Sequence, residues 1–489
     1  MVKKTKQGYQ SVKTDTTNDF ENTFQVTEEQ SASTLYVLFI ASVAAIGGFL
    51  FGFDSGVING TVTALGNAFN SSDVSTGFNV ASVLLGCALG ALAAGPLSDH
   101  YGRKAIMIIT AIIFAISAFG SGISVSSTEF IFYRLFGGLG IGAASVLAPA
   151  YIAEVAPAAI RGRLATLQQL AIVLGLFVAF LSNYIIASEA GGAEEILMLD
   201  IEAWRWMFWV ELIPAILFFV GVLFIPESPR YLVAQGKIAQ ARRVFNKIYA
   251  TDDGQQIEKV QASLHGDKKN SIKDLFIEGQ KKIHPIIWVG ITLSVFQQFV
   301  GINVVFYYGS ELWRAAGFDE SQSLLINVLT GTTNIVSTFI AIALVDKIGR
   351  KPLLLIGSIG MFISLGALSY IFGTAGLNEV GKLVLTENMG TLALIMANLF
   401  VVFFGLSWGP VVWVLLGEMF NNRIRGAALA IAASAQWLAN FTITMTFPVL
   451  LGSIGLAGAY GLYTISAFIS IFFVIKYIKE TRGIQLEDM

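Results

Sequence analysis

The sequence contains few cysteines, histidines and charged residues, and each shortage excludes a class of protein. Among its 489 residues only Cys87 is a cysteine, so no disulfide can form within the chain. Three histidines, His100, His265 and His284, are too few for a histidine metal cluster, and we expect no metal and no other cofactor. Charged residues make up 13% of the chain and the net charge is −2, which leaves no basic surface for nucleic acid.

Two sequence patterns are also missing. Residues 1–33 are polar and lack the apolar core of a signal peptide, so we expect a mobile cytoplasmic tail there. No Gly-x-x-x-x-Gly-Lys-Ser/Thr loop occurs, which excludes a pump driven by nucleotide hydrolysis. The apolar segments described next contain no histidine and no nucleophile–base pair, so we do not expect an enzyme.

Apolar residues are abundant instead. They make up 55% of the chain, about 269 residues, and the mean hydropathy is +0.68, too high for a soluble globule. Because a membrane-spanning helix takes roughly 20 residues, this composition allows at most about 13 spans. Twelve apolar windows of that length occur, and all must be helical because lipid cannot satisfy free backbone groups. The windows are 35–58, 78–97, 105–125, 130–151, 164–186, 206–225, 285–309, 323–345, 353–373, 391–416, 427–451 and 456–475.

The longest polar interruption divides the windows into six and six. It contains Ile238, Ala241, Phe245 and Ile248 at helical spacing, which predicts an amphipathic helix beside the bundle. The predicted units are the polar tail (1–33), an N-terminal six-helix bundle (34–225), a cytoplasmic helical middle domain (226–284), a C-terminal six-helix bundle (285–478) and a cytoplasmic tail (479–489).

The placement of basic residues predicts the orientation. Twelve spans put both termini on one side of the membrane. All 31 lysines and arginines except Arg134, Arg205, Arg314 and Lys382 lie in segments on that side. By the positive-inside rule, both termini are predicted to be cytoplasmic in a multi-pass protein of the cell membrane.

The two halves repeat one another, as transporters with a central binding site do. The segment 95–104 (Gly-Pro-Leu-Ser-Asp-His-Tyr-Gly-Arg-Lys) recurs as 343–351, Glu154…Arg161-Gly recurs as Glu418…Arg425-Gly, and 226–230 recurs weakly as 479–483.

Further motifs lie in the same order as in a known family. They are Phe136-x-Gly138-Leu139-x-x-Gly142 with Tyr151, Glu154 and Arg161; Asp346-Lys347-x-Gly349-Arg350-Lys351; Gln297-Gln298-x-x-Gly301-x-Asn303; Trp408-Gly409-Pro410; and Gln436-Trp437-x-x-Asn440. From about Leu35 to Gly483 the chain resembles the sugar porter family of the major facilitator superfamily, which includes bacterial sugar/proton symporters and facilitative glucose transporters.

The resemblance implies an all-α membrane protein with twelve transmembrane helices in two six-helix repeats, which moves a sugar by alternating access. We expect a monomer in the lipid bilayer that transports a hexose such as D-glucose, or a pentose such as xylose, together with a proton. Two residues favour the hexose. The xylose symporter has a glutamine where this chain has Leu176, and this chain resembles the glucose transporters at Phe306. Facilitated uniport is the main alternative, and a non-transporting sugar receptor is a remote one.

Three charged residues lie inside the predicted spans: Asp54, Arg134 and Glu211. Charge in a span is costly, so each is a functional candidate. Asp54 and Arg134 are predicted to share one depth, and the resemblance implies that such a pair couples the proton. The alternative is a static ion pair that positions two helices, and Glu211 either relays a proton or pairs within the bundle.

A sugar is bound by amides, which both donate and accept hydrogen bonds, and by aromatic rings. Each amide could instead bond a neighbouring helix, but the family's sugar ligands match six residues here. Those six are Gln169, Gln297, Gln298, Asn303, Trp408 and Gln436. To these predicted ligands we add Asn334, Phe51, Tyr307 and Trp437. We also expect the helices to bend at Gly301, Gly405, Gly409 and Pro410.

The repeated basic motifs are predicted to form a cytoplasmic gate whose ion pairs exist only when that side is closed. The alternative is that these basic residues merely set topology. The gate residues are Asp99, Arg103, Lys104, Glu154, Arg161, Glu227, Arg230, Asp346, Arg350, Lys351, Glu418, Arg425 and Glu480, with Glu418 a predicted partner for both repeats.

Overall fold

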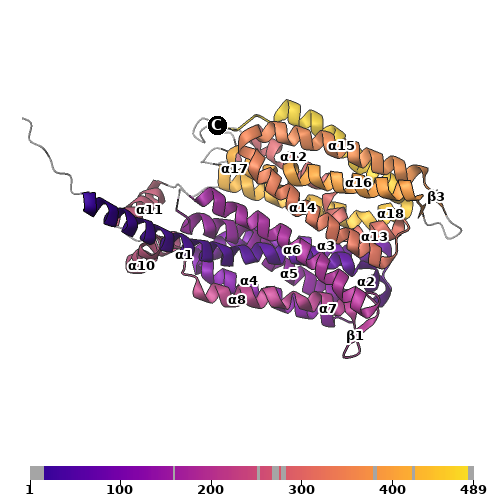
Figure 1. Ribbon diagram of the computed structural model, residues 1–489, viewed down its shortest axis with the longest axis horizontal. Helices are drawn as coiled ribbons and strands as arrows, with labels where there is room; N and C mark the ends of the chain where they lie inside the picture. Colours follow the sequence, from indigo (N-terminus) through magenta and orange to yellow (C-terminus); the bar gives the residue numbers. More distant parts are fainter. Residues whose placement is uncertain are drawn as a thin grey trace, which may run out of the picture.

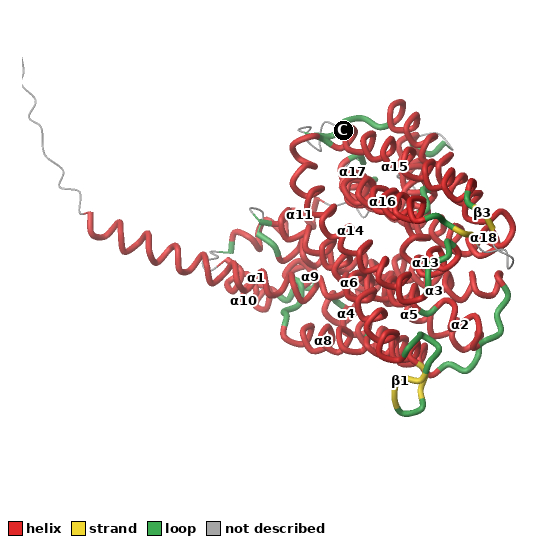
Figure 2. Tube along the Cα trace, turned by 45° about the vertical axis from the view of Figure 1, so that its right-hand side comes forward, coloured by secondary structure: helices red, strands yellow, loops and turns green. Residues whose placement is uncertain are grey.

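The computed structural model describes residues 16–157, 160–249, 254–266, 275–276, 282–377, 383–420 and 424–482. Within these ranges the chain is helical apart from two small hairpins and short connections (Figure 2). Side chains of several described helix ends, including Arg161 and Arg425, lie outside the description.

The first half of the chain forms one bundle. Its elements are α1 (Thr16–Val57), η1 (Ile58–Gly60), α2 (Val62–Ala68), α3 (Asp73–Tyr101), α4 (Arg103–Ile123), α5 (Ser127–Val155), α6 (Arg161–Ala190), the hairpin of β1 (Ile196–Met198) and β2 (Ile201–Glu202), α7 (Ala203–Val210) and α8 (Leu212–Phe224).

Three short helices follow, and then the second bundle. The short helices are α9 (Pro229–Ala234), α10 (Ile238–Tyr249) and α11 (Gln255–Gly266). The second bundle comprises α12 (Pro285–Phe299), α13 (Ile302–Ala315), α14 (Glu320–Ile348), α15 (Arg350–Thr374), the hairpin of β3 (Gly376–Leu377) and β4 (Leu383–Val384), α16 (Glu387–Phe403), η3 (Phe404–Trp408), α17 (Gly409–Glu418) and α18 (Arg425–Tyr477).

The described residues contain eleven helical segments long and apolar enough to cross a membrane. The last of them, Ala427–Tyr477, has 51 residues, more than twice the roughly 20 that one crossing needs. Gly455 interrupts it with φ 65° and ψ −177°, so α18 crosses twice. The chain therefore makes twelve crossings, as the hydropathy predicted.

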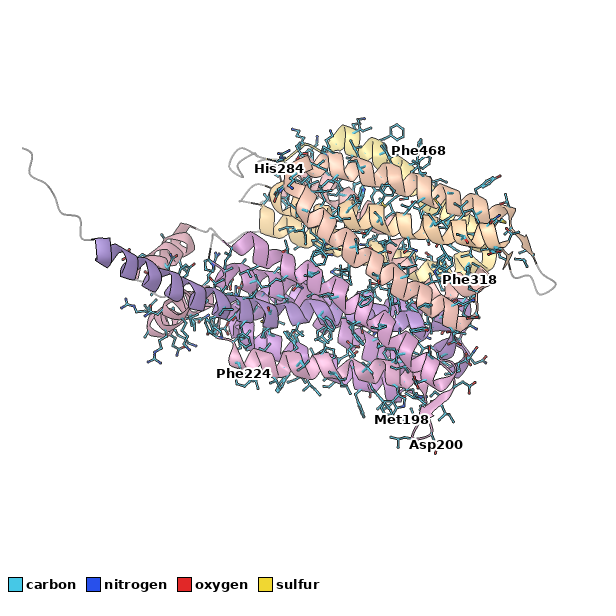
Figure 3. The ribbon with its side chains drawn as sticks, viewed as in Figure 1. Met198, Asp200, Phe224, His284, Phe318 and Phe468 are labelled. Carbon is cyan, nitrogen blue, oxygen red and sulfur yellow. The ribbon has the colours of Figure 1, made fainter. Side chains whose placement is uncertain are left out.

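The two bundles lie side by side, and both ends of the chain lie at the same end of the molecule (Figure 1). Figure 3 marks this end by Phe224 and His284, and the opposite end by Met198, Asp200 and Phe318. We name them the termini end and the hairpin end. The helices α9, α10 and α11 lie at the termini end, where α10 buries Ala241, Phe245 and Ile248 as their spacing predicted.

Glycines allow the helices of one bundle to approach closely. A Cβ added at Gly52 on α1 would stand 1.9 Å from the carbonyl oxygen of Ile172 on α6. A Cβ added at Gly142 on α5 would stand 2.0 Å from the carbonyl oxygen of Cys87 on α3. Small residues at helix contacts are typical of membrane bundles, because lipid supplies no hydrophobic drive between helices.

Several crossings are interrupted near the middle of the molecule. Gly301, with φ 84°, separates α12 from α13, and the π-helical segment η3 separates α16 from α17. Glu211 and Pro214 lie where α7 gives way to α8. The first two interruptions fall at the glycines and the proline that predicted them.

One local difference concerns the N-terminal region. We predicted a mobile tail over 1–33, whereas α1 begins at Thr16 and continues into the first crossing. Extending an existing helix fixes one residue per added hydrogen bond and needs no new nucleus. Residues 1–15 lie outside the described residues.

Candidate functional site

A cavity of about 100 Å³ lies between the two bundles at the level of the helix interruptions. Amide, hydroxyl and aromatic side chains from both halves line it. Of the ten predicted sugar ligands, five lie in its wall: Phe51, Gln169, Asn303, Tyr307 and Asn334. Leu176 and Phe306, which favoured a hexose, also line it.

A chain of amides fixes one wall of this cavity. The Asn303 amide donates to Gln298 Oε1, and Gln298 Nε2 in turn lies 3.4 Å from Gln297 Oε1. Gln297 Nε2 then donates to the carbonyl oxygens of Trp408 (2.8 Å) and Gly409 (3.2 Å). These carbonyls lie at the junction of η3 and α17, so the two interrupted crossings are held together by side chains.

Gln297 and Gln298 are buried behind Asn303 and support the wall, so they are not part of its lining in this conformation. Trp408 is also placed differently from the prediction. Its indole N–H donates to Leu354 O (3.1 Å) and Ser358 Oγ (3.0 Å), so the ring is tied to α15 and not to the cavity. The reason is the π-helical turn of η3, which rotates the side chains on either side of it.

The remaining predicted ligands lie on α18. Trp437 packs edge-on against Phe51, with ring centroids 5.6 Å apart. Gln436 Oε1 is buried and has no hydrogen-bond partner among the described residues. Asn440 donates to the Tyr307 hydroxyl at 3.3 Å.

The three charged residues predicted inside the spans lie in the first bundle. Arg134 on α5 forms an ion pair with Asp54 on α1, and both residues are buried, with relative exposures of 1% and 3%. Arg134 also lies over the Phe208 ring, 5.9 Å from its centroid. Glu211 is buried within electrostatic range of both charges.

The ion pair occupies a chamber of its own, with a free volume of about 10 Å³. Arg134 Nε has no hydrogen-bond partner among the described residues. A buried guanidinium N–H without an acceptor is costly, so this arrangement of the ion pair leaves one hydrogen-bond donor of Arg134 unsatisfied.

The basic motif at the termini end of the first bundle forms a cluster. Arg103 makes two parallel bonds to Glu154, Nε to Oε2 at 3.1 Å and Nη2 to Oε1 at 3.0 Å, and an ion pair with Asp99 at 2.9 Å. Glu227 accepts the backbone N–H of Arg103 at 2.9 Å. Lys104 Nζ caps a helix end by donating to Leu223 O and Ile225 O.

The second bundle repeats this cluster residue by residue. Arg350 bonds Glu418 through Nε (3.0 Å) and Nη2 (2.7 Å), and pairs with Asp346 at 3.0 Å. Glu480 accepts the backbone N–H groups of Arg350 and Lys351, both at 3.0 Å. Burial alone would raise the pKa of Glu480, but these N–H groups and those of Thr481 and Arg482 outweigh it and lower the pKa below its ordinary value.

These contacts correct two details of the predicted gate. Its ion pairs were expected only when the cytoplasmic side is closed, but they form inside each bundle while the hairpin end is sealed. Glu418 was a predicted partner for both repeats, but it bonds Arg350 of its own bundle, and Arg103 likewise bonds Glu154 of its own bundle. The reason is proximity, because each arginine begins a helix beside the carboxylate that ends a neighbour of the same bundle. Arg230 lies in α9; the side chains of Arg161 and Arg425 lie outside the description.

Among the described residues, several side-chain hydrogen bonds between the bundles lie at the hairpin end, and we did not predict them from the sequence. Asn59 on η1 donates to Phe306 O at 2.9 Å, and its Oδ1 accepts from Ser310 N (3.0 Å) and Asn327 Nδ2 (2.7 Å). The signal that could have found them is a group of polar residues near the same ends of three predicted spans.

Three further bonds join the bundles at the hairpin end. Thr63 donates to Glu311 and accepts from Arg314 Nη1 at 2.7 Å, and Glu320 accepts the backbone N–H of Ala193 at 2.9 Å. Among the described residues, the ion pairs at the termini end stay within one bundle, whereas these bonds cross between the bundles. The structure is thus a state sealed at the hairpin end.

Two similar bundles around one polar cavity, with a seal at one end, define a secondary transporter that exposes its site alternately. The family model described as "Sugar (and other) transporter" matches residues 40–489. The chain belongs to this family, the sugar porters of the major facilitator superfamily.

Individual relatives cover nearly the whole chain. A glucose transport protein of Synechocystis is 55% identical over 462 residues, 94% of this chain and 98% of the relative. The D-xylose-proton symporter of Escherichia coli is 39% identical over 488 residues, 93% and 95% of the two chains.

Solved structures show the same fold. The partially occluded, inward-open xylose transporter XylE of E. coli matches with a TM-score of 0.79 at 36% identity, covering 92% of this chain and 99% of that one. Its inward-open form matches with a TM-score of 0.78 at 37% identity, covering 92% and 98%.

Proposed function

We propose that the protein is a sugar/proton symporter of the cell membrane that takes up a hexose, with D-glucose as the first candidate. The hairpin end faces outside and both termini face the cytoplasm, in keeping with the concentration of basic residues at the termini end. The protein acts as a monomeric transporter and not as an enzyme. Facilitated uniport without a proton is the competing function.

The observation that carries the symport proposal is the buried Asp54–Arg134 pair. Asp54 and Arg134 are two of the few charged residues inside the crossings, and keeping a charge there is costly. When Asp54 is ionised it pairs with Arg134; when it takes up a proton, the Arg134 charge loses that partner. Glu211 is the remaining carboxylate nearby, so it serves as the second partner of Arg134. The two arrangements give the bundle two states that differ by one proton.

The sugar proposal rests on the central cavity. Gln169, Asn303 and Asn334 supply amides from both bundles, and Phe51 and Tyr307 supply aromatic faces. Uncharged amides suit the hydroxyls of a sugar, which both donate and accept. Gln436, whose Oε1 has no partner among the described residues, completes the site once a sugar is bound, while Gln297, Gln298, Trp408 and Trp437 hold the walls.

Leu176 and Phe306 support a hexose over a pentose. Both line the cavity and offer no hydrogen-bonding side chain. A larger sugar with a further CH₂OH group fills apolar space that a pentose leaves empty. The 55% identity to a glucose transport protein points the same way.

The contacts at the two ends of the molecule suggest how access to the cavity alternates. The bonds around Asn59 hold the outer side shut, so the cavity in this conformation serves the inner side. The Arg103–Glu154 and Arg350–Glu418 clusters fasten helix ends within each bundle, which lets each bundle move as a rigid body. Closure of the inner side brings these clusters together and favours the outward-open state.

The test is sugar-driven proton movement. Purified protein in proteoliposomes is given an inward glucose gradient with no imposed pH difference. Symport predicts that the external medium becomes more alkaline as glucose enters, and that protonophore treatment removes the change. Glucose entry without any pH change would support facilitated uniport instead. Competition by xylose tests sugar choice, and xylose outcompeting glucose would reverse the proposed order.

A further inference from the structure

Two cavities in this molecule share one wall. The central cavity and the chamber of the Asp54–Arg134 pair are both lined by Phe51, Ser55 and Tyr307. Phe51 and Ser55 lie one turn apart on α1, whereas Tyr307 comes from α13, so both bundles build the wall. A change in how the bundles meet here reaches both cavities at once.

The Tyr307 hydroxyl lies at the centre of this wall. It accepts a bond from Asn440 at 3.3 Å, and the Ser55 hydroxyl is its other side-chain partner. Ser55 directly follows Asp54 in the chain. The group that touches the second bundle therefore stands beside the carboxylate that pairs with Arg134.

The chamber behind the wall has little tolerance for movement. Its free volume of about 10 Å³ has room for no more than one water molecule. With Arg134 Nε unpartnered among the described residues, a small displacement of α1 changes both the pairing and the access of water. The wall thus controls whether Asp54 exchanges its proton.

We propose that Ser55 is the positioning residue that transmits sugar occupancy to the Asp54–Arg134 pair through the Tyr307 hydroxyl. In the empty cavity Ser55 holds Tyr307 and keeps the chamber closed. A sugar hydroxyl that bonds Tyr307 replaces Ser55, releases α1 and admits water to Asp54. This inference rests on the proposed proton-coupled sugar transport; Ser55 itself carries no proton.

The experiment measures protons taken up per glucose in proteoliposomes of the full-length protein, and the pH profile of glucose uptake. Ser55→Ala is compared with Ser55→Thr, which keeps the hydroxyl. The matched control is Ser182→Ala, because the Ser182 hydroxyl bonds the carbonyl of Ala179 within the same helix, α6, at 2.9 Å. We expect the proton-to-glucose ratio to fall at least threefold in Ser55→Ala, with a flatter pH profile, and to stay near wild type in the other two.

Tyr307→Phe removes the other hydroxyl of the same contact and serves as an independent variant. It should lower the ratio by a similar factor, and the double variant should lower it no further. A wild-type ratio in Ser55→Ala, or an equal fall in Ser55→Thr, would overturn the inference alone. Absence of glucose-driven proton uptake in the wild-type protein would overturn the proposed symport, and the inference with it.

Discussion

Asn59 on η1 and Phe306 on α13 are joined by a hydrogen bond of 2.9 Å across the seam between the two bundles. The same asparagine side chain accepts two more bonds from the second bundle. One residue therefore supplies three of the bonds that close the hairpin end.

Asn59→Ala should open this seal. Each hydrogen bond contributes about 1 kcal/mol net, so losing the set shifts the balance toward a state that is open at the hairpin end by about 1–3 kcal/mol. Hydrogen exchange would show faster exchange of backbone amides in η1 and the hairpin end of α13. Asn388→Ala, an exposed residue in the first turn of α16, is the control. Unchanged exchange at η1 would mean that other contacts hold the hairpin end shut.

Leu176→Gln should change sugar preference. Leu176 lines the central cavity, and an amide there adds hydrogen-bonding groups in place of an apolar surface. We expect xylose to gain on glucose in competition assays by about tenfold, the order of one buried polar contact. Leu174→Gln provides the comparison, because Leu174 is exposed on the surface of the bundle and does not line that cavity. An unaltered preference would place sugar discrimination elsewhere in the wall.

Gly52→Ala should destabilise the first bundle. The added methyl group would stand against the carbonyl oxygen of Ile172, and overpacking of this kind costs about 1–3 kcal/mol. The Tm in detergent should fall by several degrees. Gly95→Ala is the matched variant, because a Cβ at Gly95 meets nothing within 4 Å. Equal Tm values for the two variants would contradict the close α1–α6 packing.

Glu480 predicts a pH dependence of stability. Its pKa in the folded protein lies below the ordinary value of 4.5, so the stability that it contributes is fully present above that pH. As the pH falls through the lowered folded pKa, the carboxyl takes up a proton and the contribution is lost. Melting curves between pH 3 and pH 7 should show a smaller acid-induced loss of Tm in Glu480→Gln than in the wild type. Identical acid profiles for the two proteins would contradict this role.

Much of the fold was predictable because the hydropathy and charge of each segment depend only on the residues within that segment. Apolar windows gave the twelve crossings, and Gly301 and Pro410 marked interrupted helices. The pairing of Asp54 with Arg134 followed from equal depth in the membrane.

The parts that could not be predicted depend on helix rotation and on the conformational state. The π-helical turn of η3 ties Trp408 to Ser358, and nothing in the local pattern reveals that rotation. The bonds of Asn59 join the two bundles, so they depend on how the bundles are arranged in this conformation. Glu418 pairs with Arg350 as predicted, but the predicted pairing with Arg103 was wrong, because the sequence repeat alone does not say whether pairs form within or between bundles.

The central claim is that Asp54 couples glucose to a proton, and Asp54→Asn tests it most directly. An amide keeps the shape of the side chain but cannot titrate, so proton movement should stop while binding and exchange continue. The measurement is glucose-driven proton uptake beside glucose counterflow in the same proteoliposomes. The account predicts counterflow in both proteins and proton uptake in the wild type only. Proton uptake of equal size in Asp54→Asn, or none in the wild type, would contradict it.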